Sequence, residues 1–278
     1  MMSTIELLKK WINEANAIVI GAGSGLSTAA GFEYGGKTFL KHFEYMKYLY
    51  GYQDMYSAGF HSFNTKEEMW GYWSKFVYLN RYATDALPFY KKLFDLIKNK
   101  NYFVITTNVD HQFQKAGFDK KRLFYTQGDY GLFQCSKPCH KQTYDNRESI
   151  LKMIDNQTEH KIPSSLIPKC PKCGASMRMI LRCDDTFVED AGWHEAKKRY
   201  DKFLNANASK NILFLELGVG WNTPGIIKLP FMQMTYQMPN AHYVCINKGY
   251  NQIYDEIKDK AMILNQDILE IFSEIDEF

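Results

Sequence analysis

The chain has 278 residues, 34 lysines and arginines against 31 aspartates and glutamates, and a mean hydropathy of -0.40. This length suits one compact core with a smaller attached module, and an aromatic content of 15% excludes disorder over most of the chain. The small and dispersed charge excess excludes a nucleic-acid binder, because such a protein needs a concentrated basic surface.

The first residues predict an amphipathic helix. Ser3 and Glu6 have the spacing of a capping box, and Ile5, Leu8 and Ile12 share one helical face. A secretory signal would instead need an uncharged apolar stretch followed by a cleavage site. No apolar run reaches the roughly 18 residues that a membrane helix needs. We therefore expect a cytoplasmic protein with no membrane partner.

Five short apolar runs predict the strands of a mostly parallel α/β sheet. Amphipathic helical stretches lie between several of them, which is typical of such a sheet. The first run ends in a glycine turn, residues 21–25, and we expect a helix to begin near Leu26. The five runs are residues 17–20, 102–106, 212–217, 242–246 and 261–264.

Two segments depart from this alternation. Residues 37–87 are rich in aromatic residues and methionine at helical spacing. This pattern predicts an inserted helical module whose aromatic residues form a core rather than a ligand cage. Residues 128–190 are rich in cysteine, lysine and polar residues and contain no long apolar run. That segment needs something other than a hydrophobic core to hold it together.

Four of the six cysteines form two close pairs, Cys135 with Cys139 and Cys170 with Cys173. Each pair bridges a tight turn and can present two thiolates to one tetrahedral zinc ion. Reduced core cysteines, or disulfides in an exported protein, are the alternatives. Four thiolates leave no position for water, so this zinc would be structural. His140 could replace one ligand, but we expect it to be a bystander.

The other two cysteines, Cys183 and Cys245, lie on apolar stretches. We expect both to be ordinary buried thiols.

The glycine turn at residues 21–25 is suited to a pyrophosphate. Small residues let the backbone approach the phosphates, and the following helix offers unpaired N–H groups. A glycine turn can equally serve only to pack a helix on a strand, so other motifs must decide. Residues 23–32, Gly-Ser-Gly-Leu-Ser-Thr-Ala-Ala-Gly-Phe, resemble the first signature of the sirtuin family. Residues 106–110, Thr-Thr-Asn-Val-Asp, resemble that family's Thr-Gln-Asn-Ile-Asp segment.

Three later stretches agree with the same family in order. Residues 217–224 resemble the turn that holds the nucleotide, and residues 246–247, Ile-Asn, resemble the pair at the adenosine ribose. Residues 265–268 resemble the loop on the adenine side. The resemblance therefore extends over about the whole chain.

This resemblance implies a fold and a division of the chain. The fold would be α/β, with a Rossmann-like, doubly wound parallel sheet and a smaller module made of a four-cysteine zinc ribbon and a helical insertion. Residues 1–36, 86–127 and 191–278 would form the NAD-binding domain. Residues 37–85 would form the helical insertion, and residues 128–190 the zinc-ribbon module.

The resemblance also implies NAD as co-substrate and assigns roles to individual residues. Asn108 would contact the nicotinamide ribose, and Asp110 would hold the nicotinamide side. Gln127 would orient a ribose hydroxyl or the acceptor, and Arg182 would position the acceptor or hold a carboxylate. The residues implied to bind NAD are Gly21, Ala22, Gly23, Gly25, Ser27, Tyr34, Asn108, Asp110, Gln127, Gly218, Gly220, Asn222, Thr223, Asn247 and Ile268.

Each of these roles has a simpler alternative. Asn108 and Asp110 could only cap a helix at the end of a strand. Arg182 could be a surface arginine beside the acidic pair at residues 184–185. His111 could replace a missing base, but we expect an exposed loop histidine.

Departures from the family pattern point to the reaction. Residues 33–36, Glu-Tyr-Gly-Gly, stand where deacylating sirtuins have Pro-Asp-Phe-Arg, and residues 181–189 lack the proline of the family's Leu-Arg-Pro segment. Gln127 stands where those enzymes have the histidine that serves as general base. Losing a general base typically costs about a hundred- to ten-thousandfold in rate. This pattern resembles the macrodomain-linked, class M sirtuins, which are protein ADP-ribosyltransferases.

The sequence therefore predicts an NAD-dependent protein ADP-ribosyltransferase. The resemblance implies a lipoylated carrier related to the glycine-cleavage H protein as acceptor, and a macrodomain hydrolase as functional partner. Two alternatives stay open. One is a lysine deacylase that uses another base, and the other is a catalytically silent NAD-binding sensor.

Overall fold

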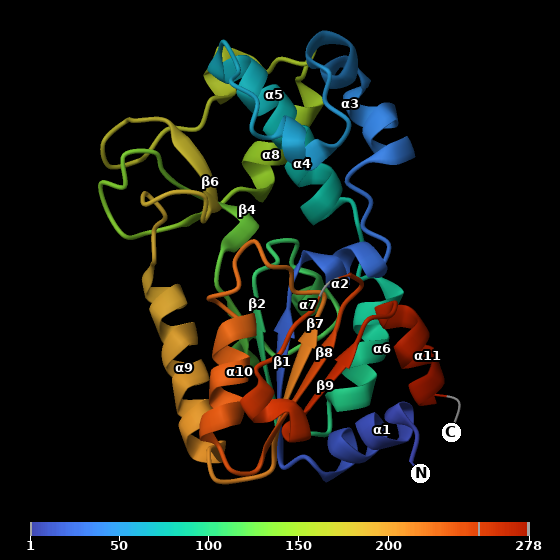
Figure 1. Cartoon of the computed structure of the whole chain (residues 1–278). Coiled ribbons are helices and arrows are strands. Elements are labelled where there is room, and N and C mark those ends of the chain that lie inside the picture. Colours follow the sequence, from blue (N-terminus) through green and yellow to red (C-terminus); the bar gives the residue numbers. More distant parts are fainter. Residues whose placement is uncertain (1, 250, 277–278) are drawn as a thin grey trace.

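The computed structural model describes residues 2–249 and 251–276. The chain folds into two units, a larger one built on a parallel sheet and a smaller one set at the carboxyl ends of its strands (Figure 1). Positions 1, 250 and 277–278, which the sequence assigns to the NAD-binding domain, lie outside the described residues.

The larger unit contains a six-stranded sheet in which all neighbours are parallel, in the order β3-β2-β1-β7-β8-β9. Counted within this sheet, the order is 3-2-1-4-5-6, which is the doubly wound Rossmann arrangement. The predicted parallel α/β sheet is thus confirmed. The strands are β1 (Ala17–Ala22), β2 (Tyr102–Thr106), β3 (Leu123–Tyr125), β7 (Ile212–Leu217), β8 (Ala241–Ile246) and β9 (Ala261–Leu264).

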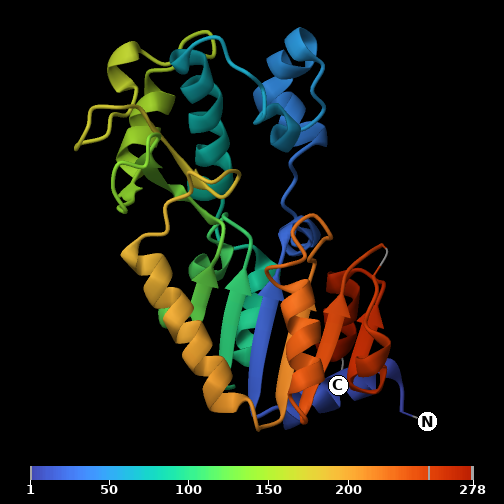
Figure 2. The ribbon, with the colours of Figure 1, turned by 60° about the vertical axis from the view of Figure 1, so that its left-hand side comes forward.

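Helices cover both faces of this sheet, so successive residues of a strand are buried on opposite sides (Figures 1 and 2). In β1, Ile18 and Ile20 pack with α1, α6 and α11, whereas Ala17 and Val19 pack with α9 and α10. This burial on both faces explains why the strands are continuous apolar runs in the sequence. The helices are α1 (Thr4–Glu14), α6 (Pro88–Ile97), α9 (Ala191–Asn207), α10 (Lys228–Gln237) and α11 (Ile268–Asp276).

Two sequence predictions can be checked at the start of the chain. Ser3 caps α1, and the reciprocal hydrogen bond from its backbone N–H to Glu6 completes the predicted capping box. The first strand continues to Ala22 instead of ending at Ile20, because Gly21 and Ala22 still pair with β2 and β7. The remaining short elements of this unit are α2 (Ser24–Ala29), α7 (Gln112–Lys115), η2 (Lys120–Arg122) and η4 (Asp255–Lys260).

The smaller unit combines the two segments that departed from the α/β alternation. The first forms helices, and the second forms an antiparallel three-stranded sheet in the order β5-β4-β6 with one further helix. Its elements are α3 (Gly36–Tyr50), α4 (Met55–Ala58), α5 (Lys66–Val77), a π-helical turn η1 (Tyr78–Tyr82), β4 (Gly128–Cys135), β5 (Tyr144–Asp145), α8 (Arg147–Asp155), η3 (Ser164–Leu166) and β6 (Met177–Leu181).

The two segments of the smaller unit share one hydrophobic core. Trp70 of α5 packs edge-on against Phe133 of β4 with ring centroids 5.0 Å apart, and Phe76 packs against Tyr130 at 5.1 Å. The prediction that the aromatic residues of residues 37–87 form a core is thus confirmed for many of them. Others are exposed on α3 and α4, including Tyr48, which is 76% exposed.

The chain crosses four times between the two units. It leaves the larger unit before α3, returns before α6, leaves again at β4 and returns between β6 and α9. Tyr34, Gln127 and Arg182 all lie at these crossings.

Candidate active site

Two glycine turns meet at the carboxyl ends of β1 and β7. The N–H of Gly25 donates to the carbonyl oxygen of Gly218 at 2.9 Å, and that of Gly23 donates to the oxygen of Leu217 at 3.1 Å. A Cβ on Gly23 would lie 2.6 Å from the Gly218 oxygen. These strands flank the point where the strand order reverses, which is where sheets of this type bind ligands. The two turns therefore pack closely together as a backbone cradle, because no Cβ at Gly23 separates them.

Gly21 has a different local role. It lies inside β1, where a Cβ would come within 2.4 Å of Ile227 and 2.5 Å of Phe231. The missing side chain lets α10 approach the sheet.

Asn108 and Asp110, which follow β2, join the first glycine turn through a network of hydrogen bonds. The Asn108 amide donates to the carbonyl oxygen of Gly23 at 2.9 Å and to the Ser27 hydroxyl at 3.1 Å. That hydroxyl lies 2.5 Å from Asp110 Oδ2 and 2.8 Å from the hydroxyl of Tyr90. Three residues that the sequence predicts for the site, Ser27, Asn108 and Asp110, are thus brought together.

Asp110 is buried at the centre of this network, with 3% of its surface exposed. Burial raises the pKa of its carboxyl group, and the charge of Asp129 acts in the same direction, against hydrogen bonds from Ser27 and Gln112. Burial and the charge of Asp110 also raise the pKa of Tyr34. Tyr34 stacks on Phe32, with 5.8 Å between the ring centroids.

Gln127 lies between β3 and β4, immediately before β4. Its carbonyl oxygen accepts a hydrogen bond of 3.0 Å from the N–H of Arg182, so these two predicted residues are neighbours. The next residue, Gly128, has a φ of +110°, and a Cβ there would lie 1.9 Å from the oxygen of Ile180. Only glycine fits this position, which fixes the direction in which the chain enters β4.

The side chain of Arg182 has a specific partner. Its guanidinium pairs with Glu189 at 2.6 Å and lies over the ring of Phe187, with 4.2 Å between Cζ and the ring centroid. The alternative of an arginine in an ion pair at the surface therefore stays open, although the partner is Glu189, and Asp184 pairs with Arg178.

His111 is not the exposed loop histidine that we expected. Its Nδ1 lies 2.7 Å from Oδ2 of Asp129, and its side chain is 27% exposed. Asp129 is buried and pairs with Arg81 at 2.8 Å through its other oxygen. Burial acts to raise the pKa of Asp129, but the hydrogen bond from His111 and the charges of Arg81 and His111 hold it below the ordinary value. Sequence reasoning missed Asp129 and Arg81, since only the fold brings them to His111.

The residues predicted for the adenosine end are divided between surface and core. Gly220, Asn222 and Thr223 are exposed beyond β7. Asn247 follows β8 and donates to the oxygen of Val219 at 3.3 Å, which links it to the second glycine turn. Ile268, the first residue of α11, is 3% exposed and belongs to the core of the larger unit.

The four predicted cysteines converge on one point at the edge of the smaller unit. Their sulfur atoms all lie within 4.8 Å of one another, with 3.6 Å between Cys135 and Cys173 and 3.7 Å between Cys139 and Cys170. A tetrahedral zinc ion with Zn–S bonds of about 2.3 Å would place its sulfurs about 3.8 Å apart. The donor set and the spacing therefore fit a four-thiolate metal site.

The surroundings of His140 and of the two remaining cysteines can also be described. His140 Nδ1 lies 3.0 Å from the sulfur of Cys139, while its Nε2 contacts Tyr144 at 2.7 Å. Cys245 is buried as expected. The expectation for Cys183 is wrong, because this residue is exposed in the loop after β6, where its sulfur contacts Arg178.

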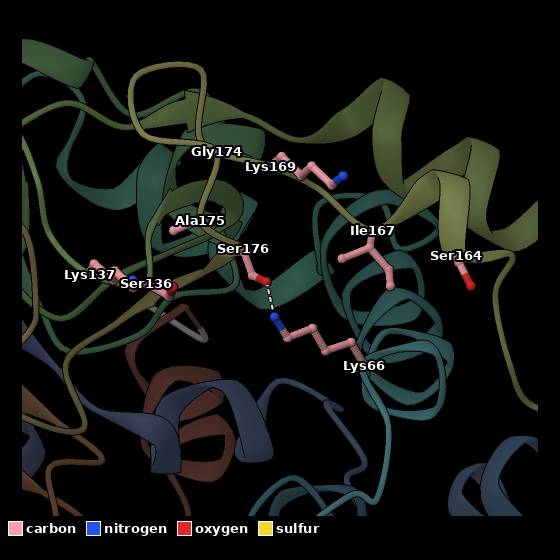
Figure 3. A pocket seen from close by; sticks show the side chains of 9 residues that line it. All are labelled: Lys66, Ser136, Lys137, Ser164, Ile167, Lys169, Gly174, Ala175 and Ser176. Carbon is pink, nitrogen blue, oxygen red and sulfur yellow. Dashed lines mark hydrogen bonds between the residues drawn. The ribbon is translucent and has the colours of Figure 1, made fainter.

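A separate pocket of about 530 Å³ lies in the smaller unit (Figure 3). Three lysines line it, and the ammonium group of Lys66 reaches the hydroxyl of Ser176 across the opening. None of the residues that sequence analysis assigned to the site lines this pocket. Its lining residues are Lys66, Ser136, Lys137, Ser164, Ile167, Lys169, Gly174, Ala175 and Ser176.

Among residues 2–249 and 251–276, no helix combines the length and apolar character needed to cross a membrane.

Comparisons with known proteins agree with this geometry. The chain is 39% identical over 264 residues to a Staphylococcus aureus protein named protein ADP-ribosyltransferase, a match that covers 95% of this chain and 84% of the relative. It is 31% identical over 237 residues to a Fusarium oxysporum protein named probable bifunctional ADP-ribose hydrolase/ADP-ribosyltransferase, covering 82% of this chain and 39% of the relative. No family model matches.

Solved structures share the fold at low sequence identity. A structure of Sir2Tm bound to a propionylated peptide has a TM-score of 0.64 and 18% identity, and covers 99% of this chain and 98% of its own. A complex of Sir2 with a p53 peptide and NAD+ has a TM-score of 0.57 and 18% identity, with the same coverage. Together, the shared fold and the extended match to a named transferase show that the chain belongs to the sirtuin family, in its branch of protein ADP-ribosyltransferases.

Proposed function

We propose that the protein transfers ADP-ribose from NAD to an acceptor protein and releases nicotinamide. The observation that carries this proposal has two parts. Ser27, Asn108 and Asp110 form an assembled hydrogen-bond network, and Gln127 stands in place of a basic residue. A glutamine side chain cannot take a proton near neutral pH. Displacement of nicotinamide by an acceptor does not require the later deprotonation of a ribose hydroxyl, on which deacylation depends. The named transferase among the relatives supports the same reaction.

The residues present fit NAD. A Cβ on Gly23, Gly25 or Gly218 would meet the backbone of the opposing turn within 3 Å, so the two turns can join into one cradle only because all three residues are glycine. NAD, when bound, supplies the ADP-ribosyl group and nicotinamide as its leaving group. Gly220, Asn222, Thr223, Asn247 and Ile268 remain proposed contacts to the nucleotide, as do Gly21 and Ala22 at the end of β1.

At the reacting end of NAD, the residues of the chain would have separate roles. Asn108, fixed by the Gly23 carbonyl and the Ser27 hydroxyl, orients the nicotinamide ribose. Asp110 and Tyr34 border the nicotinamide side, where burial excludes water from the bond that breaks. Gln127 orients a ribose hydroxyl or the acceptor through hydrogen bonds. Arg182 positions the acceptor after its guanidinium exchanges Glu189 for a group of the incoming protein.

We further propose a lipoylated carrier related to the glycine-cleavage H protein as acceptor, and a macrodomain hydrolase that reverses the modification. A relative named for both ADP-ribose hydrolase and ADP-ribosyltransferase supports a functional link between the two activities. Zinc is the proposed occupant of the four-cysteine cluster, in a structural role. The cytoplasm is the proposed location, because its reducing conditions keep such cysteines as thiols.

The deciding experiment follows the label of adenine-labelled NAD. The purified protein is incubated with a lipoylated carrier protein in one reaction and with a pool of acetylated peptides in another. Label joined to the carrier is the expected result. Label in a small acyl-ADP-ribose would establish deacylation instead, and label left in intact NAD in both reactions would favour a sensor that only binds NAD.

Two variants test the assigned residues within the same assay. Asn108→Ala and Gln127→Ala should each abolish transfer while leaving the folded structure intact by circular dichroism. Asn205→Ala, which alters an exposed amide on α9, is the matched control and should keep full activity. Full activity in both site variants would contradict the proposed function.

A further inference from the structure

His111 and Asp129 form a histidine–carboxylate pair beside the proposed site. Nδ1 of His111 lies 2.7 Å from Oδ2 of Asp129. His111 directly follows Asp110, and Asp129 comes two residues after Gln127. The N–H of Tyr130 donates to the oxygen of Val109 at 3.0 Å and holds these two segments together. The pair therefore lies between the two groups of residues to which the reaction has been assigned.

The carboxylate of Asp129 is held in place from several directions. Its Oδ1 accepts hydrogen bonds from Arg81 Nε at 2.8 Å and from the N–H of Gly131 at 2.7 Å, which leaves Oδ2 for the imidazole. Asp129 is 5% exposed, and its low pKa keeps it ionised at neutral pH. A buried, ionised acceptor of this kind fixes the ring orientation of the histidine that it binds.

This hydrogen bond also selects the tautomer of a neutral His111. Asp129 can only accept, so the ring proton sits on Nδ1 and the lone pair is on Nε2. Within the described parts of the chain, 2–249 and 251–276, no hydrogen bond to Nε2 is present. The side chain is 27% exposed, so solvent reaches part of the imidazole group.

The backbone of His111 adds a second, independent observation. Its φ is +66°, in the left-handed region, and it occupies the N-cap position of α7 without making a side-chain capping bond. Asparagine or aspartate would suit this position and would also cap the helix. The imidazole of His111 contacts Asp129 instead, so it does not cap α7. The local fold therefore gives no reason for a histidine at this position of positive φ.

We propose that His111 is a catalytic residue that takes the proton from the nucleophile of the acceptor, with Asp129 as its positioning residue. This assignment rests on the proposed function. The acceptor is then a protic group, such as a hydroxyl, thiol or amine. A bond forms from its heteroatom to the anomeric carbon of the ribose as the bond to nicotinamide breaks. The electron pair leaves with neutral nicotinamide, and the acceptor's proton moves to Nε2 of His111.

Several other charged groups surround the pair and share its pH dependence. Asp110 and Lys115 face it from either end of α7, Arg81 from η1, and Tyr125 from β3. Variants must therefore be compared over a range of pH and not at a single value.

The test measures nicotinamide release against pH with a lipoylated carrier protein as acceptor. The rate of His111→Gln near pH 7.5 should be about a hundred- to ten-thousandfold below that of the wild type. Its dissociation constant for NAD should stay within a few-fold of the wild type. His42→Gln, a half-buried histidine of α3, is the control and should keep the wild-type profile.

A second variant separates chemistry from folding. His111→Gly accepts the left-handed backbone, and imidazole added to the solution should restore part of its activity. Wild-type rates in His111→Gln at every pH would overturn the assignment. A wild type that releases no nicotinamide with the carrier, with acetylated peptides or with water would overturn the proposed function, and this assignment with it.

Discussion

The N–H of Gly25 donates a hydrogen bond of 2.9 Å to the carbonyl oxygen of Gly218, which joins the turn after β1 to the turn after β7. The two turns are 193 positions apart in the sequence but pack as one surface. Gly218 has a φ of +62°, and a Cβ there would lie 2.2 Å from the backbone nitrogen of Leu26. The contact therefore allows no side chain at this position.

Gly218→Ala should destabilise the protein by about 1–3 kcal/mol and weaken NAD binding, because the added carbon forces the two turns apart. Urea unfolding gives the stability, and calorimetric titration with NAD gives the affinity. Gly225→Ala is the matched control, since its Cβ would meet nothing within 4 Å. Tight NAD binding by Gly218→Ala would show that the joined turns are not the nucleotide cradle.

Metal analysis should find about one zinc per chain, and changing both Cys170 and Cys173 to serine should remove it. Loss of the metal should lower the melting temperature by about 10 °C or more, because the ribbon has little apolar core of its own. Cys183→Ser is the control, as this exposed thiol lies apart from the cluster. Equal zinc content in the double variant and the wild type would contradict the assignment of the cysteines.

Asp110→Asn should be more stable than the wild type at pH 7 while losing transfer activity by about a hundredfold or more. Burial raises the pKa of Asp110 above its ordinary value of 3.8, so the folded state resists ionisation of this group. Below pH 3.8 the carboxyl group is protonated in the folded and the unfolded state, so its burial does not lower the free energy of unfolding. This free energy falls as the pH rises from 3.8 through the raised pKa.

The advantage of Asp110→Asn should therefore shrink as the pH falls through the raised pKa towards 3.8, and it should stay constant below that value. Unfolding midpoints of both proteins across the acid range check this sign. A constant difference at every pH would mean that Asp110 does not carry a buried charge.

Lys228 and Glu216 form a buried ion pair beneath the second glycine turn, with 1% and 0% of their side chains exposed. Lys228→Met should destabilise the protein by about 3–5 kcal/mol, because Glu216 is left charged and unpaired. The double variant Glu216→Gln with Lys228→Met should recover most of this loss, since an amide needs no counter-charge. Urea midpoints measure both effects, with the exposed Lys258→Met as control. A double variant no more stable than Lys228→Met would refute this account.

Apolar runs and cysteine spacing were informative because each is a local pattern with one structural solution. Strands buried on both faces are mainly apolar, so β1 and β7 are visible in the sequence, and the one charged residue of β7, Glu216, is paired with Lys228. The cysteine pairs at 135 and 170 lie on turns that direct both thiols to one point. The closeness of Asn108 and Asp110 to the first glycine turn can also be predicted, from the family resemblance and the parallel sheet.

Other features could not be predicted from local sequence patterns. The register of β4 and β6 shifts between Asp129 and Phe133, so the alternation that would mark a strand is broken there. The partner of His111 depends on how β4 enters the smaller unit past Gly128. The contact of Arg182 with Glu189, and the exposure of Cys183, depend in the same way on the path of the loop after β6.

The core shared by the two segments of the smaller unit limits how this part of the protein can change in evolution. Trp70 and Phe76 come from one segment, and their partners Phe133 and Tyr130 come from the other. A chimaera that takes only the helices or only the ribbon from a relative would place unmatched aromatic surfaces together. We therefore expect large substitutions in the core of one segment to require compensating changes in the other, although residues of the larger unit separate the two segments in the chain.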